Sequence, residues 1–278
     1  MYINYWGLLR SPFDGESDLR SYYSGELQEE ALLRLQYVIE QRKGAALLVG
    51  ETGVGKSLLT RLLATRLEAT QFPFVNVLFP QMAPHELLAY LAVELGADPR
   101  SVESSDVGMD RVIREIERQL DYCARQDRAP VLVIDEAHLI EHPSVFQTLR
   151  VLLNVQPQGV SPLTLLFVGQ PELAPQIARV APLHDRIAAR CVLQSFDSLQ
   201  TRAYVAHRLD IAGATRALFT EEALRGVHEL SGGVPRRINR LCDLALLLGF
   251  ADDSSQVTAA HLETAADEFQ ATPRRRAA

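Results

Sequence analysis

A glycine-rich segment early in the chain has the residue types needed to bind a phosphate group. It runs Gly50, Glu51, Thr52, Gly53, Val54, Gly55, Lys56, Ser57 and Leu58, and it matches the pattern G-x-x-x-x-G-K-[ST] in full. The glycines let successive backbone N–H groups point inward, and the helix expected next adds the positive end of its dipole. A buried apolar run before it and an apolar helix pattern after it supply the required context. We expect Lys56 to reach the β- and γ-phosphates of a nucleotide and Ser57 to bind Mg²⁺.

Two carboxylates follow another buried run further along the chain. Asp135 ends the run VLVI, and Glu136 is the next residue. In a sheet of parallel strands, ligands bind beyond the carboxyl ends of the strands. Asp135 is therefore a candidate to hold Mg²⁺ through its water shell, and Glu136 to polarise an attacking water as general base. His138 is open to two interpretations, a structural hydrogen bond or a sensing role.

The four letters from Asp135 to His138 also name a class of nucleic-acid helicases. Such a helicase needs two RecA-like lobes, a Ser-Ala-Thr element after the acidic box and a Gln-Arg-x-Gly-Arg element in its second lobe. This sequence contains neither element. The run after the acidic box ends in FVGQPEL, and nothing after Ser195 resembles a second sheet. These departures argue against the helicase interpretation.

Five short apolar runs between Ala45 and Ser195 alternate with helical patterns. They read AALLV, FPFVNVLF, APVLVID, LTLLFVG and CVLQS. Buried strands that alternate with helices predict an α/β fold with a five-stranded parallel sheet, covered on both faces. One helix is expected from about Asp106 to Arg125, with Cys123 as a small core residue. After Ser195 the pattern predicts only helices, with Thr220 as one N-cap.

These patterns divide the chain into four regions. Residues 1–44 form an aromatic-rich N-terminal segment and a first helix, and residues 45–195 form the nucleotide-binding core. Residues 196–270 form a small all-α lid domain, and residues 271–278 form a basic tail. The tail has no apolar periodicity, so its ordinary interpretation is a solvated terminus.

Composition limits the classes of partner. With 47% hydrophobic residues in 278, the chain can bury a substantial core, and its net charge of −7 argues against a surface built for broad phosphate neutralisation. Cys123, Cys191 and Cys242 lie far apart without a C-x-x-C pair, which indicates a reducing compartment rather than a disulfide framework or a zinc site. The start lacks a signal-peptide pattern, and the longest apolar run is far too short to span a membrane. We expect a soluble, cytoplasmic chain.

Four further polar residues follow the acidic pair. Gln170 ends a predicted strand, where its amide would lie near the γ-phosphate as a sensor of hydrolysis. Arg186 and Arg190 are four residues apart, which places them on one face of a predicted helix before the last strand. They are either surface residues in salt bridges or a finger delivered to a neighbouring subunit's γ-phosphate. Arg236 opens a lid helix within GVPR and is a candidate to reach the nucleotide of its own subunit.

The order of these motifs resembles the AAA+ superfamily. Within it, YWGLLRSPFD, GETGVGKS, VLVIDEAH, FVGQPEL, DRIAAR and GGVPRRINRLCDLALL resemble the general-secretion-pathway protein A (ExeA-like) ATPases over about residues 1–250. Gln170 departs from the Asn or Thr usual in the wider superfamily. The resemblance implies one role for each matching residue: Lys56 and Ser57 form Walker A, Asp135 and Glu136 form Walker B, Gln170 is sensor 1, Arg190 with Arg186 as its rival is the finger, and Arg236 is sensor 2.

The resemblance also implies an activity and partners. We expect an ATP hydrolase that uses Mg²⁺ in a homo-oligomer, a ring or filament, and acts on envelope or secretion-system proteins. A DNA-binding ATPase of the transposition-helper type is the alternative, with Arg236, Arg237 and Arg240 as a basic strip. A nucleotide-binding scaffold with little hydrolysis is a third reading. Tyr22 and Tyr23 either pack against the domain or flank the adenine.

Larger members of the ExeA-like family continue through a membrane span into a periplasmic peptidoglycan-binding region. The matching motifs do not reach such a region, so the resemblance implies nothing about it here. The basic triplet Arg274-Arg275-Arg276 would suit the inner face of a membrane.

Overall fold

The computed structural model describes residues 2–14, 18–77, 80–102, 107–154 and 162–270. Backbone contacts group the described residues into two units. The α/β unit comprises Glu26–Thr52 and Leu59–Leu193, and the helical unit comprises Met1–Gly25, Gly53–Leu58 and Gln194–Ala278. The expected region 1–44 is thus divided between the two units, and the expected basic tail, 271–278, lies outside the described residues.

The α/β unit is built on one five-stranded parallel sheet with the strand order β2-β3-β4-β1-β5. The predicted fold class, a parallel sheet followed by an all-α region, is confirmed. The strands are β1 (Ala45–Gly50), β2 (Phe74–Val77), β3 (Val131–Ile134), β4 (Thr164–Gly169) and β5 (Ile187–Leu193). The helices are α2 (Glu26–Glu40), α3 (Lys56–Arg66), α4 (Pro84–Glu94), α5 (Pro99–Val102), α6 (Met109–Arg125), α7 (Pro143–Leu152), α8 (Leu173–Ala178) and α9 (Ala181–His184), with α3 belonging to this unit from Leu59 onward.

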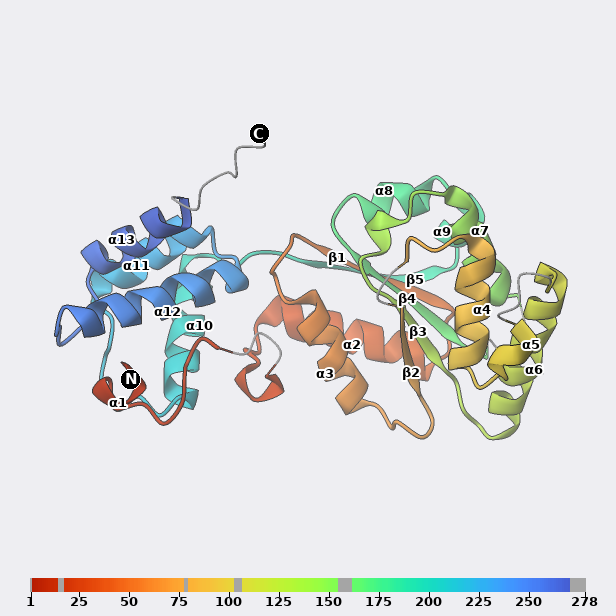
Figure 1. Cartoon of the computed structure of the whole chain (residues 1–278), viewed down its shortest axis with the longest axis horizontal. Coiled ribbons are helices and arrows are strands. Elements are labelled where there is room, and N and C mark those ends of the chain that lie inside the picture. The colour runs from red at the N-terminus through yellow and green to blue at the C-terminus, as the bar shows by residue number, and fades with distance from the viewer. Residues whose placement is uncertain (1, 15–17, 78–79, 103–106, 155–161, 271–278) are drawn as a thin grey trace. The chain divides into compact units, whose positions relative to one another are not determined.

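Helices cover both faces of this sheet. Side chains alternate along each strand, so Leu47 and Leu48 of β1 point to opposite faces. Leu47 belongs to the apolar cluster that includes α4, α6 and α7. On the other face, Cys191 of β5 pairs in register with Leu48 and lies 3.9 Å from the carbonyl O of Ala31 in α2. Figure 1 shows α2 running along this side of β1 and β5. Apolar runs buried on both faces explain why the strand sequences do not alternate with polar residues.

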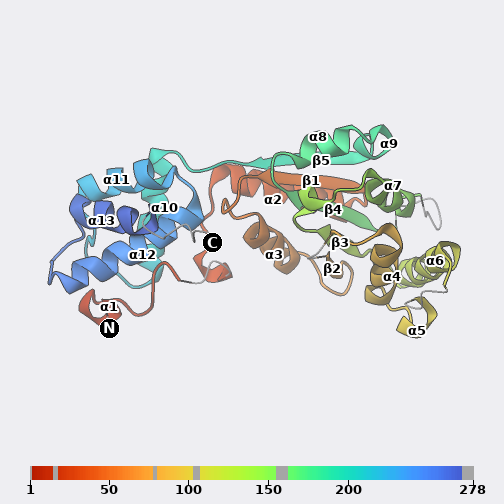
Figure 2. The same ribbon diagram turned by 45° about the horizontal axis from the view of Figure 1, so that its top comes forward.

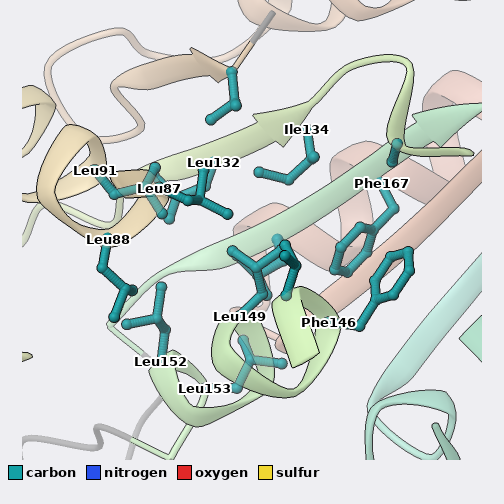
Figure 3. Close-up of a cluster of buried hydrophobic side chains, with 14 of the residues drawn as sticks. Leu87, Leu88, Leu91, Leu132, Ile134, Phe146, Leu149, Leu152, Leu153 and Phe167 are labelled. Carbon is teal, nitrogen blue, oxygen red and sulfur yellow. The ribbon is translucent and has the colours of Figure 1, made fainter. Parts of the chain in front are cut away.

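The larger apolar cluster fixes the middle of the sheet. The rings of Phe146 (α7) and Phe167 (β4) lie with their centroids 6.1 Å apart, and Phe167 is fully buried. In Figure 3 the α4 leucines Leu87 and Leu91 lie beside Leu132 of β3, and α7 carries Leu149, Leu152 and Leu153 into the same cluster. Such close packing leaves little room for movement. The ends of β3 and β4 are therefore held by a rigid core.

The helical unit contains α10 (Ser198–Ile211), α11 (Glu221–Ser231), α12 (Pro235–Ala251) and α13 (Ala259–Gln270). Thr220 caps α11 by accepting a hydrogen bond from the N–H of Ala223 at 3.1 Å, as predicted. Gly232 ends α11 in the left-handed conformation, and Pro235 opens α12. Figure 2 shows these four helices from a second direction. Local sequence therefore sets both the end of α11 and the start of α12, on either side of Gly233 and Val234.

The N-terminal segment packs on the helical unit. It contains α1 (Tyr2–Tyr5) and a 3₁₀ turn, η1 (Leu19–Ser21). Trp6 is 2% exposed and donates its indole N–H to the carbonyl O of Leu246 at 3.0 Å. Arg208 is 4% exposed, and its guanidinium donates to the carbonyl oxygens of Pro12 at 2.6 Å and Asp14 at 2.9 Å. A buried arginine is tolerated because these carbonyls satisfy its donors.

The three cysteines are free and buried. Burial raises the pKa of Cys123, in α6, and raises the pKa of Cys191 to about 11. A thiol that stays protonated is a poor nucleophile, so both side chains are inert packing groups. The prediction that Cys123 is a core residue is confirmed.

No described helix combines the length and apolar composition needed to cross a membrane. The longest described helices, α6 and α12, have 17 residues each and carry several charged side chains.

We expect Phe167→Ala to lower the free energy of unfolding by about 3–5 kcal/mol, because it removes a fully buried ring and leaves a cavity. Urea unfolding followed by circular dichroism measures the loss. Leu33→Ala is the control, since Leu33 lies on α2 and is 63% exposed. Equal losses for the two variants would contradict this assignment of the core.

Candidate nucleotide-binding site

Three neighbouring strands end at one edge of the sheet. Because β3, β4 and β1 are adjacent and parallel, their carboxyl ends meet there. Val49 pairs with Gly169 and Ile134 pairs with Phe167, so the three strands are in step. Residues that are far apart in the sequence, from Gly50 to Gln170, are thereby delivered to one edge. This edge is the usual ligand site of open parallel sheets.

The glycine-rich loop continues directly from β1 into α3. Gly53 and Gly55 have φ angles of +87° and +102°, a conformation that L side chains rarely adopt. Lys56 is the first residue of α3 and is only 6% exposed, whereas Ser57 is exposed. A buried ammonium at the N-terminus of a helix of 11 residues suits a phosphate ligand. The residues present therefore fit a nucleotide phosphate.

Arg236 lies beside this loop within the helical unit. Its backbone N–H donates to the carbonyl O of Gly53 at 3.2 Å. A Cβ added to Gly53 would lie 2.8 Å from the Cβ of Arg236 and 3.2 Å from Val234 Cγ1. Glycine is thus required at position 53 for its backbone conformation and for this close approach. The structure brings together two predicted site residues that are 183 positions apart in the sequence, Gly53 and Arg236.

The acidic pair follows β3 directly. The N–H of Asp135 donates to the carbonyl O of Val77 at 3.0 Å, which extends the β2–β3 pairing by one residue. Asp135 Oδ1 accepts the N–H of Glu136 at 2.9 Å. Glu136 has φ 48° and ψ 35°, a left-handed conformation that costs an L residue roughly 1–2 kcal/mol. Strain of this kind is concentrated at functional sites.

His138 lies between Glu136 and Gln170. Its Nδ1 is 3.3 Å from Glu136 Oε2, and its Nε2 is 2.9 Å from Gln170 Nε2. The backbone N–H of Gln170 also lies 3.4 Å from Nδ1. The ring belongs to a 3₁₀ turn, η2 (Ala137–Leu139), and is 11% exposed. The structure therefore joins the predicted general base and the predicted sensor through one imidazole.

Gly169, the last residue of β4, makes this junction possible. A Cβ at Gly169 would lie 3.2 Å from both the N and the Nδ1 of His138. Sequence reasoning did not single out Gly169, although a glycine at the end of a buried strand is a sign of close approach by another backbone or a ligand.

The predicted helix carrying Arg186 and Arg190 is wrong. Helix α9 ends at His184, Arg186 precedes β5, and Arg190 lies within β5 opposite Leu47. Alanine and arginine are strong helix formers, so DRIAAR imitates a helix, but pairing with β1 overrides that preference. Both arginines are exposed. Arg186 Nη2 is 3.3 Å from Asn154 Oδ1, and Arg190 Nη2 is 2.6 Å from His184 Nε2.

Tyr22 and Tyr23 contact the helical unit. The ring of Tyr23 makes edge-on contacts with Phe196, Tyr204 and His207, with centroids 5.5–5.8 Å apart. The carbonyl O of Tyr22 lies 2.9 Å from His207 Nε2. Both side chains are half-buried, and a role beside the adenine stays a prediction.

The parallel sheet, the glycine-rich loop after β1 and the carboxylates after β3 define a P-loop nucleotide-binding domain of the AAA+ class. A family model described as "AAA domain" matches residues 39–177. General secretion pathway protein A of Aeromonas hydrophila is 33% identical over 271 residues, which cover 96% of this chain and 48% of that protein. The chain belongs to the AAA+ family of general-secretion-pathway protein A (ExeA-like) proteins. It spans about half the length of that curated relative.

Two solved structures share the fold. The Aeropyrum pernix ORC2 protein, solved as ADPNP–ADP complexes, has a TM-score of 0.67 at 15% identity, covering 96% of this chain and 73% of its own. The Aeropyrum pernix ORC1 protein in complex with DNA has a TM-score of 0.64 at 19% identity, covering 87% and 65%. At these identities the likeness concerns the fold alone.

The backbone strain at Glu136 predicts which of two substitutions at this position gives the more stable protein. Glu136→Gly and Glu136→Val both remove the carboxylate, but only glycine adopts φ 48° without strain. We expect the valine variant to be less stable than the glycine variant by about 1–2 kcal/mol, because L residues pay that cost in the left-handed region. Thermal and urea unfolding measure the difference. Equal stabilities would show that the strain is absent.

Proposed function

We propose that this chain binds and hydrolyses ATP with Mg²⁺. One observation carries the proposal: a loop with two left-handed glycines and a buried lysine follows β1, Gln170 follows the adjacent strand β4, and Asp135-Glu136 follows β3, which pairs with the other side of β4. The loop has the donors for phosphate oxygens, and the strand ends have carboxylate and amide groups. This donor set suits a nucleotide and a hard cation.

Each residue has a distinct part in the reaction. The N–H groups of residues 50–58 and the ammonium of Lys56 bind the phosphates. The hydroxyl of Ser57 and the carboxylate of Asp135 would hold Mg²⁺, and the ion would supply positive charge to neutralise the phosphates. Glu136 orients a water molecule and takes its proton, while the amide of Gln170 donates to the γ-phosphate. Arg236, whose backbone N–H donates to the carbonyl O of Gly53, is the proposed sensor 2.

Exposed arginines on the edge strand support an oligomeric enzyme. Arg190 lies on β5, the last strand of the sheet, and Arg186 lies just before it. A guanidinium presented by one copy to the γ-phosphate of another stabilises the charge of the transition state. We propose Arg190 as this finger, with Arg186 as its rival. Hydrolysis would then depend on assembly of the homo-oligomer, a ring or a filament.

The proposed role of the oligomer is to drive or regulate assembly of a secretion or cell-envelope complex at the cytoplasmic side of the membrane. The support is the relationship to general secretion pathway protein A. The second candidate is a DNA-dependent ATPase. It is supported by Arg236, Arg237 and Arg240, which are all exposed on the first turns of α12. A neighbour of the same fold, the ORC1 protein, was solved in complex with DNA.

The chain has only two lysines, Lys43 and Lys56, which allows an internally controlled test of ATP binding. We expect Lys56→Ala to abolish binding, because the only side-chain ammonium in the loop is lost. Glu136→Gln should keep binding but lower kcat by about 10²–10⁴-fold, the usual effect of losing a general base. Fluorescent-nucleotide titration and phosphate release measure the two quantities.

Matched controls are Lys43→Ala and Glu141→Gln, at exposed positions outside the loop and the strand ends. If Glu136→Gln hydrolyses ATP as fast as the unmodified chain, the general-base role is wrong. If the unmodified chain binds ATP but does not hydrolyse it, the chain is instead the nucleotide-binding scaffold with little hydrolysis.

The finger proposal predicts that two inactive variants complement each other. We expect Arg190→Ala to lower kcat by about 10³-fold or more. Mixing it with Glu136→Gln should recover activity, because the Arg190 of one copy completes the intact site of the other. Turnover per chain should also rise with protein concentration. Arg179→Ala, at an exposed position, is the control, and the same mixture made with Arg186→Ala identifies the rival. Turnover independent of concentration and no recovery in either mixture would contradict the proposal.

Duplex DNA distinguishes the two candidate roles. A DNA-dependent enzyme should show turnover that rises with DNA and falls steeply with salt. Arg237→Ala together with Arg240→Ala should remove that rise without changing the turnover measured without DNA. If DNA leaves turnover and assembly unchanged, the DNA-dependent role is excluded.

A further inference from the structure

The two ring nitrogens of His138 face three possible hydrogen-bond partners. Nδ1 faces the carboxylate of Glu136 at 3.3 Å and the backbone N–H of Gln170 at 3.4 Å. Nε2 faces the side-chain amide of Gln170 at 2.9 Å. The turn that carries the ring is held by Gln176, whose amide donates to the carbonyl O of His138 at 3.0 Å. This hydrogen bond anchors the backbone of the turn beside the ring.

A neutral imidazole has one N–H and one acceptor nitrogen, so two arrangements exist. In the first, Nδ1–H donates to Glu136 Oε2, and Nε2 accepts from the NH₂ group of Gln170. In the second, Nδ1 accepts from the backbone N–H of Gln170, and Nε2–H donates to the side-chain oxygen of Gln170. Only the first arrangement gives the carboxylate of Glu136 a hydrogen bond from the ring.

The orientation of the Gln170 amide selects between these arrangements. Its NH₂ group and its oxygen lie on opposite sides of the amide carbon. When the NH₂ group turns to an outside acceptor, the oxygen turns to His138 and requires a proton on Nε2. The change releases one proton from Nδ1 to solvent and takes one up at Nε2, so the ring stays neutral and the proton count balances.

We propose that His138 is a positioning residue that transmits the orientation of Gln170 to Glu136. The inference rests on the proposed function, in which Gln170 donates to the γ-phosphate. Without that phosphate, the NH₂ group of Gln170 faces His138, and the ring holds the Glu136 carboxylate. With the phosphate bound, the amide turns, the histidine changes tautomer, and Glu136 is released to act on water. The general base is thus freed only when its substrate is present.

Gly169 explains why the ring can take this position. A Cβ at Gly169 would lie 2.9 Å from Leu173 Cδ2 and 3.2 Å from both the N and the Nδ1 of His138. Gly169→Ala would therefore crowd both His138 and Leu173. Its φ is not in the left-handed region, so alanine adds no backbone strain.

Nitrogen-15 NMR of the full chain reads the tautomer directly. Two-bond correlations show which ring nitrogen carries the proton, and His138→Asn assigns the signal among the seven histidines. Spectra are recorded at several pH values, so that the two nucleotide states are compared where the ring carries a single proton. We expect Nδ1–H with ADP and Nε2–H with Mg²⁺ and the imido analogue of ATP. The same tautomer in both states would overturn the proposal.

Kinetics supply an independent readout. Because the ring no longer holds Glu136 once the γ-phosphate has turned Gln170, we expect His138→Ala to change kcat by less than about threefold. Gln170→Ala should lower kcat about ten- to hundredfold, because the ring then keeps the Glu136 carboxylate from the water. Adding His138→Ala to Gln170→Ala should recover part of that loss, since the two residues act as one unit. A double variant as slow as Gln170→Ala, or slower, would overturn the proposal.

A matched control completes the test. His142→Asn, at an exposed position, should recover no kcat when it is added to Gln170→Ala. Equal recovery by His142→Asn and by His138→Ala would overturn the relay. If the imido analogue does not bind at all, the proposed function itself fails, and the relay fails with it.

Discussion

The parallel pairing of β3, β4 and β1 is the constraint on which the candidate site depends. Each strand contributes one short polar element at its carboxyl end, and the register places the ends of β4 and β1 side by side. The apolar cluster around Phe167 holds β3 and β4 against α4 and α7 (Figure 3). A rigid platform of this kind matters because groups that act together on one ligand must keep their distances. The buried core is therefore part of the chemistry of the site.

Small residues let the polar elements approach one another. Gly53 and Gly55 adopt backbone angles that other residues avoid, and Gly169 leaves room for His138. Among the described residues, four left-handed positions carry a side chain, Arg42, Asp127, Glu136 and Asp253, and Glu136 is the one that belongs to the candidate site. Within the site, glycine is used where only the backbone path matters, and strain is accepted where the side chain itself is needed.

Much of this arrangement was predictable from the sequence because it rests on local spacing. The phosphate loop, the carboxylates after a buried run and the helix caps are all written within a few residues, and the five-stranded parallel sheet is confirmed. The features that could not be predicted depend on contacts between residues that are far apart in the sequence. Ile187–Arg190 has the composition of a helix, yet its place beside β1 makes it a strand. The contact between His138 and Gln170 joins residues 32 positions apart, and no local pattern encodes that distance.

The turn after β3 explains why the ring of His138, three residues beyond Asp135, lies between the side chains of Glu136 and Gln170. A residue in the left-handed conformation reverses the chain more sharply than an extended one, and η2 begins immediately after Glu136. The turn directs the ring of His138 back to the end of β4, where Gly169 leaves space for it. The backbone conformation thus decides where the side chains of Asp135, Glu136 and His138 lie. The first carboxylate continues the sheet, the second occupies the strained bend, and the histidine connects that bend to the neighbouring strand.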